Sequence, residues 1–561
     1  MVQLLKQPAG ARQTAETPHQ KGPAQDVAGA AGKRGRGAVR RLLPLALLAV
    51  CALACLLIFY RHSGQWIDSD DASEMVLAHQ LAGEGGLISR NWYYSTELRV
   101  LNTQLVLAPL CRIFSSWHTV RIIGLAVLMG LVTASFLYFA RGAGLGRWGL
   151  WAAPMLWLPL SGAYAQYVFQ NLGYIPYMIY AFLTFGLLFR LCRALPGARR
   201  KAQAAALALL SFGVGLGGVR ELIELYLPLA GALALLALLE LRAKGILPDF
   251  SGGFKALRGL NAAPALGWSL LALAGAAAGL ACNHLVLPRW FAFGEFDDLH
   301  FTPFSWSNAH AMLGDLPGLF GFVDGAPAVS AAAPGNLFSL VLCAGSFWAA
   351  AHILRRPAGF ARPAVVLSAF FYVSLAAHAL LFLFTDMYYT ARYNMLTVLL
   401  FLPILAFCAQ KLQKISAPAA AAALAVFVAG MLCIAAAQYG DMLATHRNGG
   451  RQAAAAWLVE NGYEAGYATF WNANVLTELS NGQLQMLTVG RYGEPTVQSM
   501  EAFDLYDWLR RRDADTAPRP QNAFVLLSNE ELERYAQVSW VQAAPQVYAA
   551  NGYTVLLLME E

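Results

Sequence analysis

Long apolar runs alternate with short polar segments along most of the chain. A run of about 20 apolar residues is long enough to cross the hydrocarbon core of a bilayer as a helix. The first such run covers residues 42–60. Together with the later runs it predicts an α-helical polytopic membrane protein with about eleven spans. The later runs are 119–140, 147–161, 175–191, 203–218, 226–240, 265–287, 336–354, 364–384, 395–410 and 417–438.

Basic residues between the runs predict how the spans are oriented. Residues 1–41 are rich in Ala, Gly, Gln, Lys and Arg without apolar periodicity, and we expect a disordered basic tail there. Basic clusters then occupy alternate loops, which the positive-inside rule assigns to the cytoplasm. We therefore predict a multi-pass protein of the cell (cytoplasmic) membrane with a cytoplasmic N-terminus and an extracytoplasmic C-terminus. The clusters are Arg141/Arg147, Arg190–Lys201, Arg242–Arg258, Arg355–Arg362 and Lys411/Lys414.

The last segment, residues 439–561, has a different pattern. Residues 452–461 have helical periodicity, while 467–471, 523–527 and 553–558 are typical of strands. This predicts a small extracytoplasmic α/β domain after the transmembrane domain of residues 42–438.

Composition agrees with a membrane protein. Apolar residues make up 58% of the 561 residues and charged residues 13%, against about a quarter charged in soluble proteins. The net charge of +7 does not indicate nucleic-acid binding, because the basic residues sit in short clusters between apolar runs. The eight cysteines lie in or beside apolar segments without zinc-ligand spacing, so no metal site is predicted from them.

An acidic motif opens the first predicted outer loop, residues 61–118. Asp68, Asp70 and Asp71 precede residues 75–83, whose apolar positions recur at helical spacing. Helix capping is one interpretation, because Asp at a helix start satisfies free N–H groups. Three carboxylates in four residues exceed what a cap needs. Their mutual repulsion raises the pKa of at least one of them and prepares a site for a base or a divalent cation.

Further along this loop, Trp92, Tyr93 and Tyr94 are typical of an aromatic belt at the membrane surface. Glu97 and Arg99 are unusual in such a belt. Residues 105–114 are apolar but too short to span, which indicates a helix lying in the interface.

In order and character these elements resemble the GT-C glycosyltransferases, which use polyprenyl-phosphate sugars. The acidic motif at Asp68–Asp71, the Glu97-Leu98-Arg99 stretch, the interfacial helix and the span at 120–140 follow one another as in that family. Arg392-Tyr393 is similar to an Arg-Tyr segment that many members carry at a late span. Two features differ: Asp71 stands where Glu is usual, and no proline pair follows Arg99.

The resemblance implies a hexosyltransferase-type enzyme with a polyprenyl-phosphate sugar as donor and a lipid, glycan or protein as acceptor. It implies Asp70 as general base with Asp71 as its neighbour in the motif, and Arg99, Arg392 and Tyr393 near the donor phosphate. Asp68 and Glu97 are further candidates from the matched motifs. Arg392 alone could equally be an interfacial anchor.

Two other charged groups have alternative interpretations. Arg220, with Glu221 and Glu224, falls between two apolar runs. It could form a short outer turn with an Arg–Glu pair, because charge there is costly unless it is paired or faces a cavity. Alternatively, Arg220 could face a cavity below the first loop and bind the donor phosphate. A second acidic group could be a solvated loop, a metal site or an acceptor contact. It comprises Glu295, Asp297, Asp298 and His300.

Two functions from other classes compete with the enzyme. A transporter or flippase of an amphipathic or anionic solute would explain the many spans and Arg220. It explains less well why acidic and basic residues gather on outer loops, because transporter sites usually lie near the bilayer midplane. A non-catalytic assembly protein acting through residues 439–561 is the third interpretation.

Overall fold

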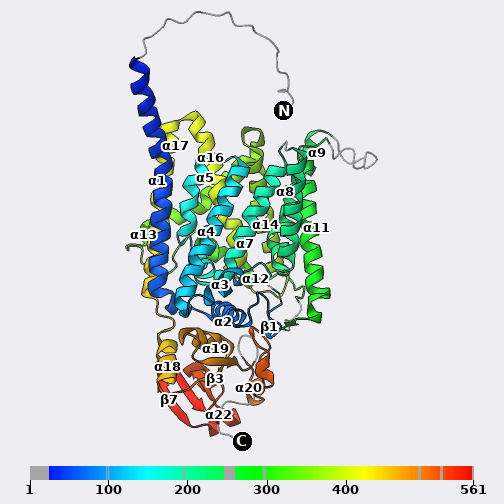
Figure 1. Cartoon of the computed structure of the whole chain (residues 1–561). Coiled ribbons are helices and arrows are strands. Elements are labelled where there is room, and N and C mark those ends of the chain that lie inside the picture. The colour runs from blue at the N-terminus through cyan, green and yellow to red at the C-terminus, as the bar shows by residue number, and fades with distance from the viewer. Residues whose placement is uncertain are drawn as a thin grey trace, which may run out of the picture.

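The structure is a computed structural model that describes residues 24–96, 98, 100–193, 196–245, 259–294, 299–490, 495–517 and 522–558, with side chains from residue 42 onward. Helices form an elongated bundle, and the C-terminal residues form a lobe at one end of it (Figure 1). The first helix, α1 (Ala24–His62), runs from the opposite end toward this lobe.

The start of α1 differs from the predicted disordered tail. Residues 24–41 continue the first span as helix, because Ala, Lys and Arg are good helix formers and extend a helix that is already nucleated. Residues 1–23 of the predicted tail lie outside the described residues.

Nine helices in the described ranges are long and apolar enough to cross a membrane, and the protein is a multi-pass membrane protein. Each of them matches a predicted run. They are α1, α4 (Trp117–Ala143), α7 (Ile175–Leu191), α9 (Leu227–Ala243), α11 (Ala263–Leu285), α13 (Ala333–Arg355), α14 (Arg362–Phe384), the pair α15 (Met395–Leu399) and α16 (Phe401–Ile415), and α17 (Ala417–Ala444).

The other two predicted spans take different forms. Residues 147–161 contain the short helices α5 (Arg147–Ala152) and η2 (Ala153–Trp157), because Pro154 interrupts the helix. Residues 203–218 belong to α8 (Gly197–Gly215), which starts with basic residues and packs against α7 and α11. A Cβ atom on Gly215 would clash with the Ala276 carbonyl of α11, so the small residue permits this close helix contact.

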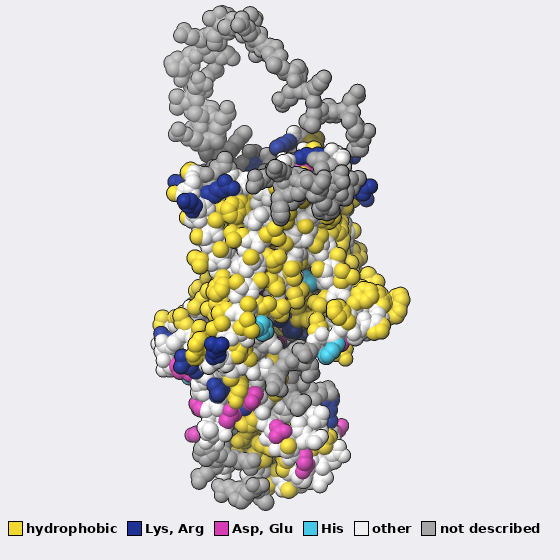
Figure 2. All heavy atoms as spheres, turned by 90° about the vertical axis from the view of Figure 1, so that its right-hand side faces the viewer, with side chains coloured by type: hydrophobic (Ala, Val, Ile, Leu, Met, Phe, Trp, Pro, Cys, Tyr) yellow, Lys and Arg dark blue, Asp and Glu magenta, His cyan; other side chains and the backbone are white. Residues whose placement is uncertain are grey.

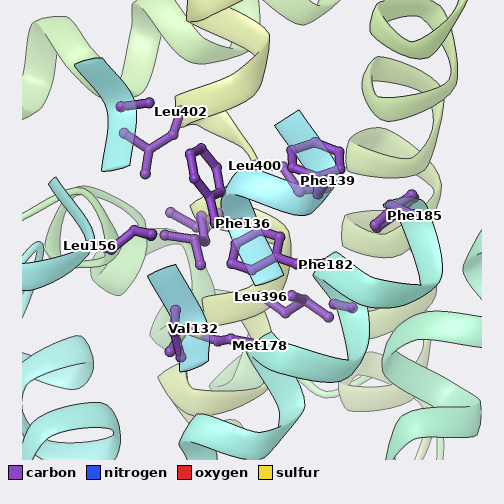
Figure 3. Packing of buried hydrophobic residues seen from close by; sticks show 14 of the residues in the cluster. Val132, Phe136, Phe139, Leu156, Met178, Phe182, Phe185, Leu396, Leu400 and Leu402 are labelled. Atoms are coloured by element: carbon purple, nitrogen blue, oxygen red, sulfur yellow. The ribbon is translucent and has the colours of Figure 1, made fainter. Parts of the chain in front are cut away.

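Aromatic side chains fill the centre of the bundle (Figure 3). Phe139 of α4 stacks on Phe182 of α7 with 5.7 Å between ring centroids. Phe185 of α7 meets Phe370 of α14 edge-on at 5.2 Å. These contacts fix α4, α7 and α14 as one rigid unit, on which the outer loops are built.

A layer of short elements lies between the bundle and the lobe (Figure 1). It includes the two predicted interfacial helices, α2 (Ser69–Glu84) and α3 (Gln104–Cys111), together with α12 (Trp306–Leu319). A three-stranded sheet joins segments far apart in the chain. Its central strand β1 (Trp92–Tyr94) pairs parallel with β2 (Ala292–Phe293) and antiparallel with β5 (Arg510–Arg511) of the lobe.

The lobe is an α/β domain, as predicted, and begins after α17 ends at Ala444. Its sheet has the strand order β4-β3-β6-β8-β7, with the first three strands parallel and the last two antiparallel to their neighbours. The predicted strand near 467–471 is cut short because Phe470 already begins α19 (Phe470–Leu479). The strands are β3 (Ala465–Ala468), β4 (Gln485–Thr488), β6 (Phe524–Ser528), β7 (Gln546–Ala550) and β8 (Tyr553–Leu557).

The orientation of the bundle stays a prediction with a direct test. Figure 2 shows Lys and Arg side chains gathered at the end of the apolar band opposite the lobe. We expect cysteines introduced at positions 20 and 195 to react only from the cytoplasm, and one at position 550 only from outside. Labelling would use a membrane-impermeant maleimide and a background without native cysteines. If positions 20 and 550 react from the same side, the orientation is wrong.

Candidate functional site

The acidic motif divides its carboxylates between two tasks. Asp68 is the N-cap of α2, and its side chain accepts a hydrogen bond of 2.9 Å from the Asp71 backbone N–H. The Asp71 side chain accepts in return from the Asp68 N–H at 3.3 Å, which completes a capping box. Burial, reinforced by the Asp68 charge, raises the pKa of Asp71 well above its ordinary value. The capping interpretation therefore holds for Asp68 and Asp71.

Asp70 is not part of this capping box. Its half-buried side chain lies near Arg392 of η9 (Ala391–Asn394), so that the carboxylate and the guanidinium attract each other. Tyr167 of η3 (Ala165–Gln170) lies beside both. Burial raises the pKa of Tyr167, the Arg392 charge opposes this, and the nearby Asp68 and Asp70 reinforce it. The fold thus brings the first loop, η3 and η9 together at one point.

Two guanidinium groups share one tyrosine ring at this point. Arg392 lies 5.5 Å and Arg220 5.4 Å from the centroid of Tyr393. Arg392 also lies 5.9 Å from the ring of Tyr167. Its Nε atom is buried and finds no hydrogen-bond partner among the described residues. The planar groups are held by aromatic faces, which leaves N–H donors for an anion.

Arg220 satisfies both interpretations given for it. It precedes η5 (Leu222–Tyr226), and its Nε lies 3.9 Å from an oxygen of Glu224, as in an Arg–Glu pair. It also borders a narrow crevice with Leu101 and Asn102 of the first loop. Its guanidinium lies over Tyr174 and Tyr177 at 4.9 and 5.3 Å.

Sequence reasoning missed the tyrosines. Tyr167, Tyr174 and Tyr177 follow the broken span, and the rings of Tyr167 and Tyr174 are in contact at 5.1 Å between centroids. The available signal is the spacing of three residues between Tyr174 and Tyr177, which places both on one face of a helix. Tyr177 falls inside the predicted span 175–191, whereas Tyr167 and Tyr174 fall in the connection before it, which the sequence analysis did not interpret.

The acidic motif is clamped against the lobe and the end of α17. Trp66 donates from Nε1 to the carbonyl of Met442 in the last turn of α17 at 3.2 Å. The buried amide of Asn448 donates to the carbonyls of Gly64 and Ile67 at 3.0 and 2.7 Å. The Ser69 hydroxyl donates to the Phe470 carbonyl of α19. The lobe therefore fixes the position from which Asp70 projects.

A buried ion pair strengthens this clamp. Arg121 of α4 makes two hydrogen bonds of 2.6 Å to the carboxylate of Glu478 in α19. It also donates to the Gln170 carbonyl at 2.8 Å and the Asp71 carbonyl at 3.0 Å. One guanidinium thus ties together the bundle, the lobe, η3 and the acidic motif. Sequence reasoning missed it, because Arg121 lies inside the predicted apolar run 119–140 and its partner is distant in the chain.

Removing Glu478 should destabilise the protein strongly. Glu478→Gln leaves the buried Arg121 charge uncompensated, which costs about 3–5 kcal/mol, and the double variant Arg121→Met/Glu478→Leu should recover much of this. The exposed pair of Arg534 and Glu530 gives the control, because Glu530→Gln should change stability by less than about 0.5 kcal/mol. Thermal unfolding in detergent measures all three. Equal midpoints for Glu478→Gln and Glu530→Gln would contradict the clamp.

Five of the candidate residues lie outside the described residues: Glu97, Arg99, Glu295, Asp297 and Asp298. His300 lies 3.2 Å from Asp386 in an exposed pair. In the described part of the chain, no group of three or more His, Cys, Asp or Glu side chains is arranged to hold a metal ion.

A cavity of about 640 Å³ lies between α2 and the lobe. The α2 residues that border it are Val76, His79, Gln80, Gly83 and Glu84. Its lining does not include Asp70, Arg220 or Arg392. The cavity is therefore separate from the cluster of Asp70, Arg220 and Arg392.

Comparison with solved structures identifies the architecture. The chain is similar to ArnT from Cupriavidus metallidurans in the apo state, with a TM-score of 0.51 and 13% identity over 92% of this chain and 98% of that one. The chain has the GT-C fold. ArnT bound to undecaprenyl phosphate gives a TM-score of 0.50 and 12% identity over 91% and 98%. No family model and no curated protein matches the sequence.

Proposed function

We propose that this protein is a membrane glycosyltransferase that moves a sugar from a polyprenyl-phosphate-linked donor to an acceptor on the extracytoplasmic side. The observation that carries the proposal is the pair of guanidinium groups, Arg392 and Arg220, over the ring of Tyr393 in a chain with the GT-C fold. The Asp70 carboxylate lies close enough to Arg392 for their charges to attract. A similar structure, that of ArnT, was solved with undecaprenyl phosphate bound. The acceptor is a lipid, a glycan or a protein.

Each group would act on a different atom of the reaction. Asp70 accepts the proton of the acceptor hydroxyl as its oxygen attacks the anomeric carbon. The bond between that carbon and the phosphate oxygen breaks, and its electron pair leaves with the polyprenyl phosphate. Arg392 and Arg220 stabilise the charge that develops there, because guanidinium donors match phosphate oxygens. Tyr393 holds both guanidinium groups in place, and Arg99 stays a candidate for the same phosphate.

The two competing functions fit these observations less well. A transporter or flippase would use charged groups to bind a solute, but it has no need for a carboxylate near the Arg392 guanidinium where the outer loops meet. A protein that acts only in assembly would need the lobe only as a binding surface. Here the lobe also holds the acidic motif in position through hydrogen bonds, which the assembly function does not explain.

The decisive test is purified protein supplied with a panel of polyprenyl-phosphate sugars and scored for release of polyprenyl phosphate. We expect release with at least one donor when the matching acceptor is present. Uptake or translocation of a donor without release would support the flippase. The same assay in EDTA tests the divalent cation predicted at the first-loop carboxylates, because loss of activity that Mg²⁺ or Mn²⁺ restores would establish it.

A further inference from the structure

A second large cavity opens on the side of the bundle, far from Asp70. It has a volume of about 680 Å³ and is bordered by α5, α13, α16 and α17; we name it the α13–α17 groove. Phe338 and Leu342 of α13, Leu402 of α16 and Phe427 of α17 are among its apolar borders. Because these helices belong to a multi-pass membrane protein, the groove opens toward the lipid bilayer that surrounds them.

One end of the groove is basic. His352, Arg356 and Lys411 border it there. The ammonium of Lys411 lies 4.1 Å from the Phe360 ring centroid, and His352 stacks on Trp348 at 5.0 Å. The described residues that border the groove include no Asp or Glu. The charges of Arg356 and Lys411 would therefore attract an anion to this end.

The dimensions of the groove fit a lipid of one leaflet. From Phe338 to His352 it follows α13 for about 21 Å, which is about half of a bilayer of about 40–45 Å with its headgroup regions. Its basic end is also distant from the proposed catalytic cluster. Lys411 comes 19 residues after Arg392 in the same candidate span, which corresponds to about 28 Å of helix.

We propose that the α13–α17 groove binds an anionic glycerophospholipid, with its phosphate between Arg356 and Lys411 and its acyl chains along Phe338, Leu342 and Leu402. Cationic side chains at the end of an apolar groove complement such a lipid in both charge and polarity. The site is separate from the donor site of the proposed function and does not depend on it. The lipid would fill the space between α13 and α17 and stabilise their packing.

The test compares lipids and variants in thermal unfolding of the full-length protein in detergent. Dioleoylphosphatidylglycerol should raise the unfolding midpoint of the wild type, and dioleoylphosphatidylcholine should raise it by less than half as much. The gain should be lost in Arg356→Gln/Lys411→Gln. The charge control is Lys201→Gln on an exposed basic turn of α8, where the gain should persist.

A glycine pair tests the apolar part of the groove. Gly345 borders the groove, and a Cβ there meets no other atom within 4 Å, so Gly345→Leu places its side chain in the space of the acyl chains. Gly267 of α11 is equally open but lies outside the groove. We expect phosphatidylglycerol to raise the unfolding midpoint of Gly267→Leu as it does that of the wild type, but not the midpoint of Gly345→Leu.

Lipid extraction followed by mass spectrometry decides the question independently of unfolding. Phosphatidylglycerol should be enriched with the wild type over its share of the membrane, and not with Gly345→Leu. Equal gains from both phospholipids, unchanged behaviour of the two groove variants, or protection by undecaprenyl phosphate alone would each overturn the proposal.

Discussion

Replacing Asp70 by Asn should lower sugar transfer by roughly a hundredfold or more, because the amide cannot take the proton of the acceptor hydroxyl. The fold should survive the change. The capping box of α2 is formed by Asp68 and Asp71, so Asp70→Asn removes neither of its hydrogen bonds. The measurement is the initial rate of polyprenyl phosphate release, with the thermal unfolding midpoint as the control for folding.

Asp71→Asn is the matched variant for this experiment. Asp71 is buried and its side chain is hydrogen-bonded at the N-terminus of α2. Asp71→Asn should therefore reduce sugar transfer less than Asp70→Asn does. Capping differences of this type cost about 1 kcal/mol, and any loss should therefore be accompanied by a lower unfolding midpoint. Near-normal turnover by well-folded Asp70→Asn protein would remove Asp70 from the proposed mechanism.

Much of the fold was predictable because membrane helices must be long and apolar. Nine of the runs became helices of this type, and the two interfacial helices were also found. The failures have physical causes. Pro154 breaks one run into α5 and η2, and basic residues in the first turn of α8 lower its apolar character. β1, β2, β4, β5 and β7 were missed because short strands depend on partners distant in the chain.

The candidate site was predictable only in part. Asp70, Arg220, Arg392 and Tyr393 were named from the sequence. The structure places Arg220 and Arg392 over the Tyr393 ring, with Asp70 close enough to Arg392 for their charges to attract. Local sequence could not separate Asp70 from Asp71, because that distinction depends on which carboxylate turns back to cap the helix. It could not reveal the pairing of Arg121 with Glu478 either. These residues are 357 positions apart, and only the docking of the lobe brings them together.

Shortening the cationic group at position 392 should impair use of the donor. Arg392→Lys keeps the charge but loses the planar guanidinium, so kcat/KM should fall roughly tenfold. Arg392→Ala loses both the charge and the guanidinium, so kcat/KM should fall roughly a hundredfold or more. The defect should fall on the donor more than on the acceptor, because the donor carries the phosphate. Initial rates at varied donor and fixed acceptor, and then the reverse, separate the two effects.

Arg447 provides the control, since its guanidinium also lies over an aromatic ring, 4.5 Å from the centroid of Trp66, but outside the cluster around Tyr393. Arg447→Lys should leave donor KM unchanged, and all variants should keep the wild-type unfolding midpoint within a few degrees. Normal donor use by both Arg392 variants would show that this residue does not bind the donor phosphate. A guanidinium that binds a transported anion affects the passage of that anion and not the release of polyprenyl phosphate. If the Arg392 variants changed only the transfer of a solute across the membrane, the transporter would therefore become the better account.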